Sequence, residues 1–540
     1  MNLLDWGVIA IYVVIIVGAG FYFGRSQKTI HDYYLGGRTV GWWQSGLSTM
    51  ATQLGAISFV SAPAFVAIKK DGGLKWLAYE FGVPLALILV MAVILPTFYR
   101  GGVISIYEYL ESRFDEGTRT LVGLFFQIGR GLATAVAVLA GGLILSTAFG
   151  ISTASAIIAV GVITVFYDVL GGIRVVIFTD VIQMVIILLG ILLCGGVALT
   201  LVGWGAAWAS LEPQRLEILD FSHWGLTPEG TYGFWPMTIG GFFLYASYYG
   251  CDQSQVQREL TVGNIDDVRK SLLINAFGRF PIVLLYCLMG VFVGAVVAEP
   301  SFLDRAAVTL GLGKVGVQAA LERDPDRLVP MFILTYLPHG LIGFIFVAIL
   351  SALMSSLDSA LNSMSAVTIR DFYQRYWNKT GDARHYLLAS KICTLLWGIF
   401  CVGFALLFAA TPDATRQTTI VLINAIGSLL YGPILATFVL GMMTRWAAPG
   451  STKIGVLAGV ALNLALWQWT AVSWLWWNFT GFATTFLVAA LFSPWETSSI
   501  KKDRLPALEP TRVHWPRIYV FVALYFLLIV GLCALIENVL

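Results

Sequence analysis

Apolar runs long enough to cross a lipid bilayer recur along nearly the whole 540-residue chain, and they constrain its fold more than any other feature. Inside a bilayer only helices and closed β-barrels satisfy every backbone hydrogen bond. These runs are too long and too uniformly apolar for the alternating strands of a barrel. The sequence therefore predicts an all-α polytopic membrane protein.

Composition agrees with this fold class, since 58% of the residues are hydrophobic and only 12% are charged, against about 25% charged in soluble domains. The pattern predicts about fourteen transmembrane helices. The candidate spans are 5–24, 42–67, 75–100, 119–149, 151–170, 174–202, 233–254, 268–298, 335–369, 385–410, 417–444, 450–469, 473–493 and 517–537. No loop between them is long enough for a folded catalytic domain, so we expect one transmembrane domain over 1–540 and no enzyme.

The distribution of Lys and Arg predicts the orientation in the membrane. With both termini placed outside, the inside loops hold more than twice as many Lys and Arg residues as the outside loops. Cytoplasmic loops carry such an excess, so we expect both termini outside. Lys69, Lys70 and Lys75 fall outside in this arrangement and oppose it.

Charge and metal-ligand patterns exclude several other classes. The net charge is only +2 and no basic stripe occurs, so the sequence gives no sign of nucleic-acid binding. The six Cys form no CxxC pair and the five His are dispersed, which argues against a disulfide framework and a zinc site. The expected partners are a small-molecule substrate and the lipid bilayer, and no obligate protein partner is evident.

Three short stretches carry a family signature. They are YDVLGGIRVVIFTDVIQ at 167–183, YYGCDQSQVQREL at 248–260 and SALMSSLDSALNS at 351–363. In this order and spacing they resemble the sodium/solute symporter family, which includes bacterial galactose and sialic acid symporters and sodium–glucose cotransporters.

The resemblance, which runs from about residue 5 to residue 450, implies a leucine-transporter-like core of two inverted repeats. We place the first repeat at 42–202 and the inverted second repeat at 233–444, with 5–24 and 450–537 as peripheral helices. By resemblance the chain lies in the plasma membrane, the inner membrane of a bacterium.

The same resemblance implies a sodium-coupled secondary active symporter that imports a small polar organic solute by alternating access. The solute would be a sugar, a sugar acid such as sialic acid, or a monocarboxylate, and sodium ion would be the only cofactor. The alternative is a membrane sensor module on a symporter-like fold. We expect such a sensor to carry a long signalling domain, whereas the chain ends at Leu540, just after the last predicted span.

A polar stripe marks the predicted helix 335–369. Ser351, Ser355, Asp358 and Asn362 follow one another at spacings that put them on one helical face. A carboxylate near mid-membrane costs about 2.5–3.5 kcal/mol on insertion scales, so it should face a cavity or a partner. Hard cations prefer oxygen ligands. The stripe therefore suits a bound sodium ion, although small serines also simply allow helices to pack closely.

Gln53 and Gly55 lie in the middle of the predicted span 42–67, where a transporter helix can break and offer free carbonyls to an ion. The alternative is an unbroken helix with a buried Gln. By resemblance the main sodium site takes three carbonyls and two hydroxyls. These belong to Ala51, Leu54, Ala352, Ser355 and Ser356.

By resemblance Asp180 is the carboxylate of a second sodium site, together with Ser355 and Ser359. We include Asp358 in this site, although sialic acid symporters have a serine at its position. The alternative is that Asp180 pairs with a loop arginine such as Arg174.

The resemblance supports two kinds of solute. Glu80, Arg279 and Asn424 match sugar-binding positions of the galactose symporter, whereas Arg130 matches the arginine that holds the carboxylate in sialic acid symporters. Arg130 near mid-span needs an anion, either the carboxylate of the substrate or a protein carboxylate such as Glu80.

Other predicted lining residues depart from both patterns. Gln53, Gly55 and Ser58 replace the Thr, Ser and Thr contacts of the relatives. Tyr248 or Tyr249 resembles the aromatic gate of the cavity, the alternative being ordinary core packing.

Overall fold

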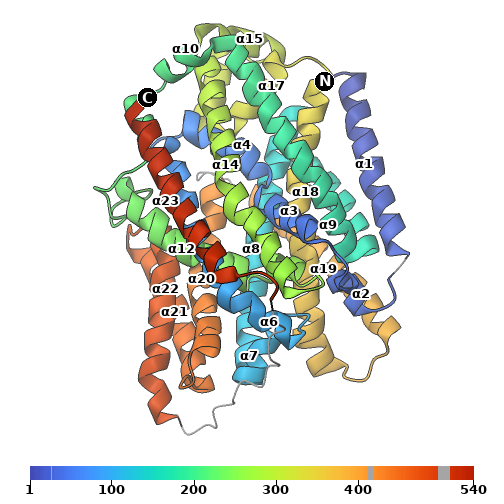
Figure 1. Cartoon of the computed structure of the whole chain (residues 1–540). Coiled ribbons are helices and arrows are strands. Elements are labelled where there is room, and N and C mark those ends of the chain that lie inside the picture. The colour runs from blue at the N-terminus through green and yellow to red at the C-terminus, as the bar shows by residue number, and fades with distance from the viewer. Residues whose placement is uncertain (26, 411–418, 497–510, 540) are drawn as a thin grey trace.

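The computed structural model describes residues 1–25, 27–410, 419–496 and 511–539, and these form a bundle of helices (Figure 1). Within the described chain, β-pairing is confined to one isolated bridge between Val40 and Val262. The all-helical class predicted from the apolar runs is therefore confirmed. The start of the predicted span 417–444 and residues 497–510 of the predicted peripheral region lie outside the described residues.

Eleven helices of the described chain are long and apolar enough to cross a membrane, or twelve if one bent pair counts as a span. They are α1 (Leu3–Gly24), the η2–α6 segment (Leu74–Gly101), α8 (Glu116–Phe149), α9 (Thr153–Val202), α14 (Ile265–Ala298), α18 with η7 (Leu341–Trp377), α19 (Ala383–Ala410), α20 (Thr419–Met443), α21 (Pro449–Trp469), α22 with η8 (Trp474–Trp495) and α23 (Trp515–Val539). The bent pair is α3 (Trp42–Gln53) with α4 (Ala56–Ala67).

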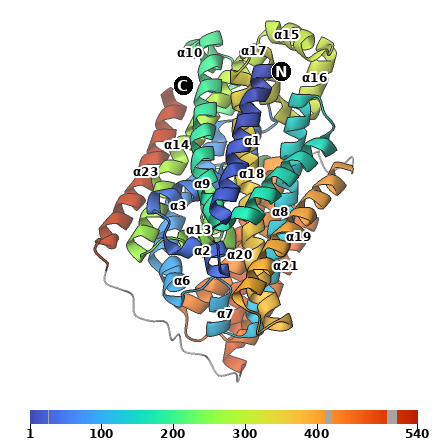
Figure 2. The same ribbon diagram turned by 90° about the vertical axis from the view of Figure 1, so that its right-hand side faces the viewer.

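Helix α9 takes up two of the predicted spans, 151–170 and 174–202. Its 50 residues would reach about 75 Å at 1.5 Å per residue, far more than the roughly 30 Å of a bilayer core. The backbone leaves helical geometry at Gly172, with φ 56° and ψ −158°, and the helix bends into two legs there (Figure 2).

The predicted span 233–254 also differs from a single long helix. It forms η5 (Pro236–Gly240) and α12 (Gly241–Cys251), and the short α13 (Gln253–Glu259) follows. Asp252 separates α12 from α13 because its backbone is extended and its side chain accepts a 2.8 Å hydrogen bond from the Ser254 amide, which caps α13. The count of fourteen spans therefore stays a prediction.

Helix α18 lies at the centre of the bundle. In the most apolar stretch of the α18–η7 span 83% of the residues are buried inside the protein, whereas in that of α23 only 17% are. Helix α18 packs against both legs of α9, against α8 and against α3 and α4, so the polar stripe predicted on it faces other helices rather than lipid. The carboxylates and hydroxyls of the stripe must find their partners within the protein.

We predict that Gly172→Ala lowers the melting temperature of the purified protein. Only glycine adopts this backbone region readily, at a cost of about 1–3 kcal/mol to other residues, and an added Cβ would lie 2.7 Å from the Tyr33 carbonyl oxygen. Gly196→Ala is the matched control, since a Cβ at Gly196 on the same helix meets nothing within 4 Å. Equal melting temperatures for the two variants would show that the bend does not depend on Gly172.

Candidate functional site

The break between α3 and α4 lies against α18. The two helices are bent by 51°, and Leu54 leaves helical geometry with φ −91° and ψ 60°. A Cβ on Gly55 would lie 3.0 Å from the Ser356 hydroxyl, which itself donates to the carbonyls of Thr52 at 3.3 Å and Ala352 at 3.2 Å. The helix is thus broken as the Gln53–Gly55 sequence predicts, and the break meets the residues of α18 expected to bind the ion.

The other residues predicted for the main ion site are close by. The Ala51 carbonyl accepts a 3.1 Å bond from the Leu54 amide, at the last turn before the break. Ser355 turns away from the break, however, because its hydroxyl donates to the Asp180 carboxylate. Four of the five predicted residues therefore converge on the break, and the fifth connects the break to Asp180.

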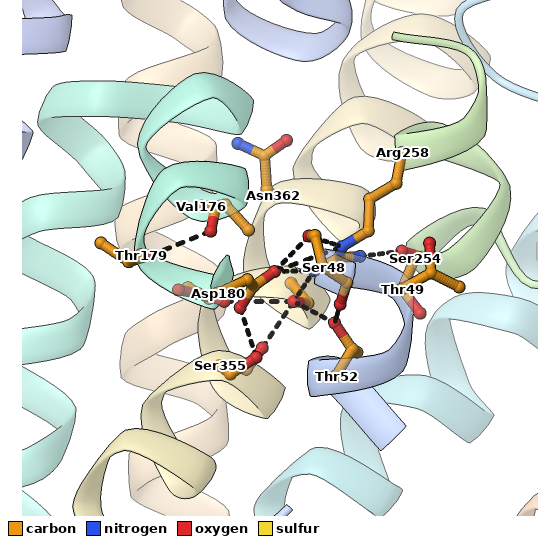
Figure 3. Close-up of polar contacts among 12 residues, drawn as sticks. Ser48, Thr49, Thr52, Val176, Thr179, Asp180, Ser254, Arg258, Ser355 and Asn362 are labelled. Carbon is orange, nitrogen blue, oxygen red and sulfur yellow. Dashed lines mark hydrogen bonds and ion pairs between the residues drawn. The ribbon is translucent and has the colours of Figure 1, made fainter. Parts of the chain in front are cut away.

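Asp180 is fully buried and lies at the centre of a polar network (Figure 3). Its Oδ1 accepts the Ser355 hydroxyl and its Oδ2 accepts the Ser48 hydroxyl at 2.5 Å. The guanidinium of Arg258 lies 3.2 Å from the same Oδ2 and forms an ion pair. Arg174, the alternative partner, donates instead to the Gly36 carbonyl at 2.9 Å and 2.8 Å.

Arg258 comes from α13 and is 1% exposed, so its charge is compensated within the protein. Besides Asp180, its guanidinium donates to the Ser48 hydroxyl at 2.7 Å, to the Ser359 hydroxyl and to the Ser254 carbonyl. The ion pair therefore joins α3, α9, α13 and α18. Sequence reasoning missed Arg258, although it lies within the second family stretch and a buried carboxylate such as Asp180 requires a cation.

Asp358 is predicted in the same ion site as Asp180 but has partners of its own. Its Oδ2 accepts the Tyr167 hydroxyl at 2.5 Å and its Oδ1 accepts the Ser359 hydroxyl at 3.1 Å. Ser359 also meets Arg258, so it is the link between the two carboxylates.

A cavity of about 150 Å³ opens beside the break. It is lined by polar and aromatic side chains from α3, α4, η2, α8, α12, α14, α18 and α20. Seven residues predicted to bind substrate are among them, namely Gln53, Ser58, Glu80, Arg130, Tyr248, Arg279 and Asn424. Tyr249 is not part of this lining, since it is buried and its hydroxyl donates to Asn275 at 3.3 Å.

Glu80 and Arg279 neutralise each other in the cavity wall. Arg279 Nε lies 2.9 Å from Glu80 Oε2 and Nη2 lies 3.2 Å from Oε1, a two-point ion pair to which the Tyr245 hydroxyl adds a 3.0 Å bond. Such a pair is geometrically specific and strong. Glu80 is therefore engaged by Arg279 and is not the partner of Arg130.

Arg130 is held more loosely. Its Nη1 lies 3.5 Å from Asp252 Oδ2, and its guanidinium carbon lies 5.7 Å from the centre of the Tyr248 ring, within cation–π range. Its Nε is buried without a hydrogen-bond partner, and so are both polar atoms of the Gln53 amide. Arg130 and Gln53 thus retain hydrogen-bonding capacity, which a solute in the cavity can use.

Comparisons with known proteins agree with this architecture. The profile of the sodium:solute symporter family matches residues 33–461. The human sodium/iodide cotransporter is 30% identical over 477 residues, which cover 87% of this chain and 69% of the relative. The sodium/sialic acid symporter of Aliivibrio fischeri is 27% identical and covers 93% and 95% of the two chains.

A solved structure of a substrate-bound, outward-open Na⁺-coupled sialic acid symporter has the same fold, with a TM-score of 0.79 and 25% sequence identity. The match covers 92% of this chain and 98% of that chain. The family profile, the relatives and the shared fold define a multi-pass membrane transporter driven by sodium rather than an enzyme. The chain belongs to the sodium:solute symporter family.

We predict that Arg258→Met lowers the melting temperature in sodium-free buffer, since breaking a buried ion pair leaves an unpaired charge and costs about 3–5 kcal/mol. Added sodium should raise the melting temperature of this variant more than that of the wild type, because sodium replaces the lost positive charge beside Asp180. Arg174→Met is the matched control. An equal sodium response in both variants would contradict the role of Arg258.

Proposed function

We propose that the chain couples the import of a small monocarboxylate to sodium, and that Arg130 binds the carboxylate. The observation that carries this proposal is the charge of the cavity wall. Of its three charged residues, Glu80 and Arg279 pair with each other, which leaves Arg130 with a 3.5 Å contact to Asp252 and the face of the Tyr248 ring. The planar guanidinium suits a carboxylate, which it can grip with two parallel hydrogen bonds.

The size of the cavity favours a short acid over a bulky sugar acid. Its volume is about 150 Å³, and a protein cavity of about this size accommodates benzene. The unpartnered Gln53 amide offers a donor and an acceptor to a further polar group of the solute. Sodium-coupled monocarboxylate transporters of Xenopus laevis and Homo sapiens are 28% identical to this chain, which supports the same class of substrate.

For sodium we propose two sites. The first is the break, with the carbonyls of Ala51, Leu54 and Ala352 and the hydroxyl of Ser356 as oxygen ligands; the Ser355 hydroxyl, which donates to Asp180, would rotate toward the break to complete the set. The second uses Asp180 with Ser355 and Ser359, and Asp358, which the sequence predicts in this site, is linked to it through Ser359. Support comes from the convergence of four of the first five residues on the break and from the position of Ser355 between the two sites.

Two sodium ions would drive an anion far better than one. A single sodium ion travelling with a monovalent anion moves no net charge, so a tenfold sodium gradient supplies only about 1.4 kcal/mol. A second ion adds the same amount and about 2.3 kcal/mol from a 100 mV potential. The total of roughly 5 kcal/mol corresponds to more than a thousandfold accumulation.

We further propose that the protein lies in the plasma membrane with about fourteen spans and with both termini outside. Both ends of the chain lie at one end of the bundle, as do α10 (Trp204–Ala209) and α15 (Pro300–Leu310) (Figure 1). Helix α7 (Glu108–Arg113) lies at the opposite end. This arrangement agrees with the bias of Lys and Arg between alternate loops. The repeats at 42–202 and 233–444 and the peripheral helices remain part of the same proposal.

We predict that Arg130→Lys weakens binding of the transported monocarboxylate roughly tenfold to a hundredfold, the equivalent of the 1.5–3 kcal/mol of a charged hydrogen bond. Melting of the ligand-free protein should change little, because the 3.5 Å contact to Asp252 is long. Ligand-induced thermal shifts measure both quantities. Normal affinity combined with a large loss of ligand-free stability would mean that Arg130 is only a counter-ion of Asp252.

We predict that Ser356→Ala raises the sodium concentration for half-maximal uptake several-fold, because the ion loses a hydroxyl ligand that water replaces only in part. Ser363→Ala is the control on the same helix, since the Ser363 hydroxyl bonds to the Ala360 carbonyl at 2.9 Å. Unchanged sodium dependence of Ser356→Ala would show that this hydroxyl serves helix packing only.

A further inference from the structure

Asp168 is a buried carboxylate that neither proposed sodium site uses. It lies on the first leg of α9, within the first family stretch, and is 0% exposed. Its Oδ1 is 3.5 Å from the Asn362 amide nitrogen, at the outer limit of a hydrogen bond, and its Oδ2 has no hydrogen-bond partner. An ionised carboxylate so poorly satisfied in a protein interior costs several kcal/mol.

The hydroxyl of Thr164, one helical turn before Asp168, also lacks a hydrogen-bond partner. Thr164 is 0% exposed and its Oγ1 has no partner. Residues four apart on a helix share one face. That face turns toward α18, because Tyr167 and Asp168 on it contact Asp358 and Asn362 of α18. Two unpartnered oxygens, one of them acidic, therefore occur together at the α9–α18 contact.

The charges at this contact do not balance. Asp168, Asp180 and Asp358 are all fully buried and repel one another electrostatically. Within the described residues, the single ion pair made by this trio is that of Arg258 with Asp180. One guanidinium cannot neutralise three ionised carboxylates, so Asp168 and Asp358 must each be protonated or accompanied by a bound cation.

We propose that Asp168 and Thr164, with Asp358 as the second carboxylate, bind a sodium ion at a site separate from the α3–α4 break and from Asp180. The ligands are carboxylate and hydroxyl oxygens, which suit a sodium ion rather than a soft metal. The proposal extends the sodium-coupled transport argued above and rests on it. Its second carboxylate, Asp358, is linked to Arg258 through Ser359, which contacts both side chains.

The groups that surround this cation site come from four elements. They are Tyr33 of α2 (Ile30–Leu35), Tyr167 and Asp180 of α9, Asp358 and Asn362 of α18, and Arg258 of α13. The Tyr33 hydroxyl donates to the Asp168 carbonyl oxygen at 3.4 Å. Since Arg258 pairs with Asp180, none of these groups supplies a positive charge to Asp168.

The test measures the number of cations bound by the full-length chain in lipid nanodiscs. Radioactive sodium reports sodium at equilibrium, and a pH-sensitive dye reports protons bound between pH 5 and pH 9. The variants are Asp168→Asn, which keeps the shape and removes the charge, and Thr164→Val. Thr485→Val is the matched control, because the Thr485 hydroxyl on α22 is also buried and unpartnered but has no acidic residue one turn away.

We expect Asp168→Asn to bind one sodium ion fewer than the wild type and Thr164→Val to bind that ion several-fold more weakly, with Thr485→Val behaving as the wild type. If Asp168→Asn instead loses one titrating proton while its sodium count is unchanged, Asp168 is a protonated buried acid and not a sodium ligand, which overturns the proposal.

An identical sodium count in the wild type and Asp168→Asn would overturn the proposal. If Asp168→Asn does not fold, an unchanged sodium affinity of Thr164→Val contradicts the site. Sodium-dependent uptake by the wild type is measured in parallel. Its absence would refute sodium-coupled transport, whereas its presence with unchanged cation counts would refute the Asp168 site only.

Discussion

The ion pair between Arg258 and Asp180 is the interaction on which the arrangement of the core depends. Neither side chain is more than 1% exposed, so each charge is tolerable only because the other is present. The hydroxyls of Ser48 and Ser359 complete the hydrogen bonding. Through these contacts a short helix, α13, is tied to α3, α9 and α18, the elements that form the break and the polar stripe.

Helix α13 also connects the ion network to the solute cavity. Asp252 caps its start and meets Arg130 at 3.5 Å, whereas Arg258, near its end, pairs with Asp180. In the proposed mechanism a carboxylate solute would compete with Asp252 for Arg130, and sodium would compete with Arg258 for Asp180. Occupancy of either site therefore changes the contacts that hold α13, which gives the proposed coupling of ion and solute a physical route.

The sequence predicted the all-helical membrane fold, the family and the broken helix at Gln53–Gly55, because hydropathy and local polar patterns depend only on residues close together in the chain. Seven of the eight predicted substrate residues line one cavity. The pairings were harder to predict. That Glu80 meets Arg279, or that Arg130 meets Asp252, depends on how helices far apart in the chain pack. Similarly, periodicity cannot distinguish one 50-residue helix bent at Gly172 from two separate spans.

The central claim is that sodium drives a small carboxylate into the cell through the Arg130 cavity. The most direct measurement is uptake into proteoliposomes of a short monocarboxylate and of its primary amide, with an inward sodium or potassium gradient at a fixed membrane potential. We expect concentrative uptake of the acid in sodium only, and little uptake of the amide in either gradient. Equal uptake of the acid in sodium and potassium, or preference for the neutral amide, would contradict it.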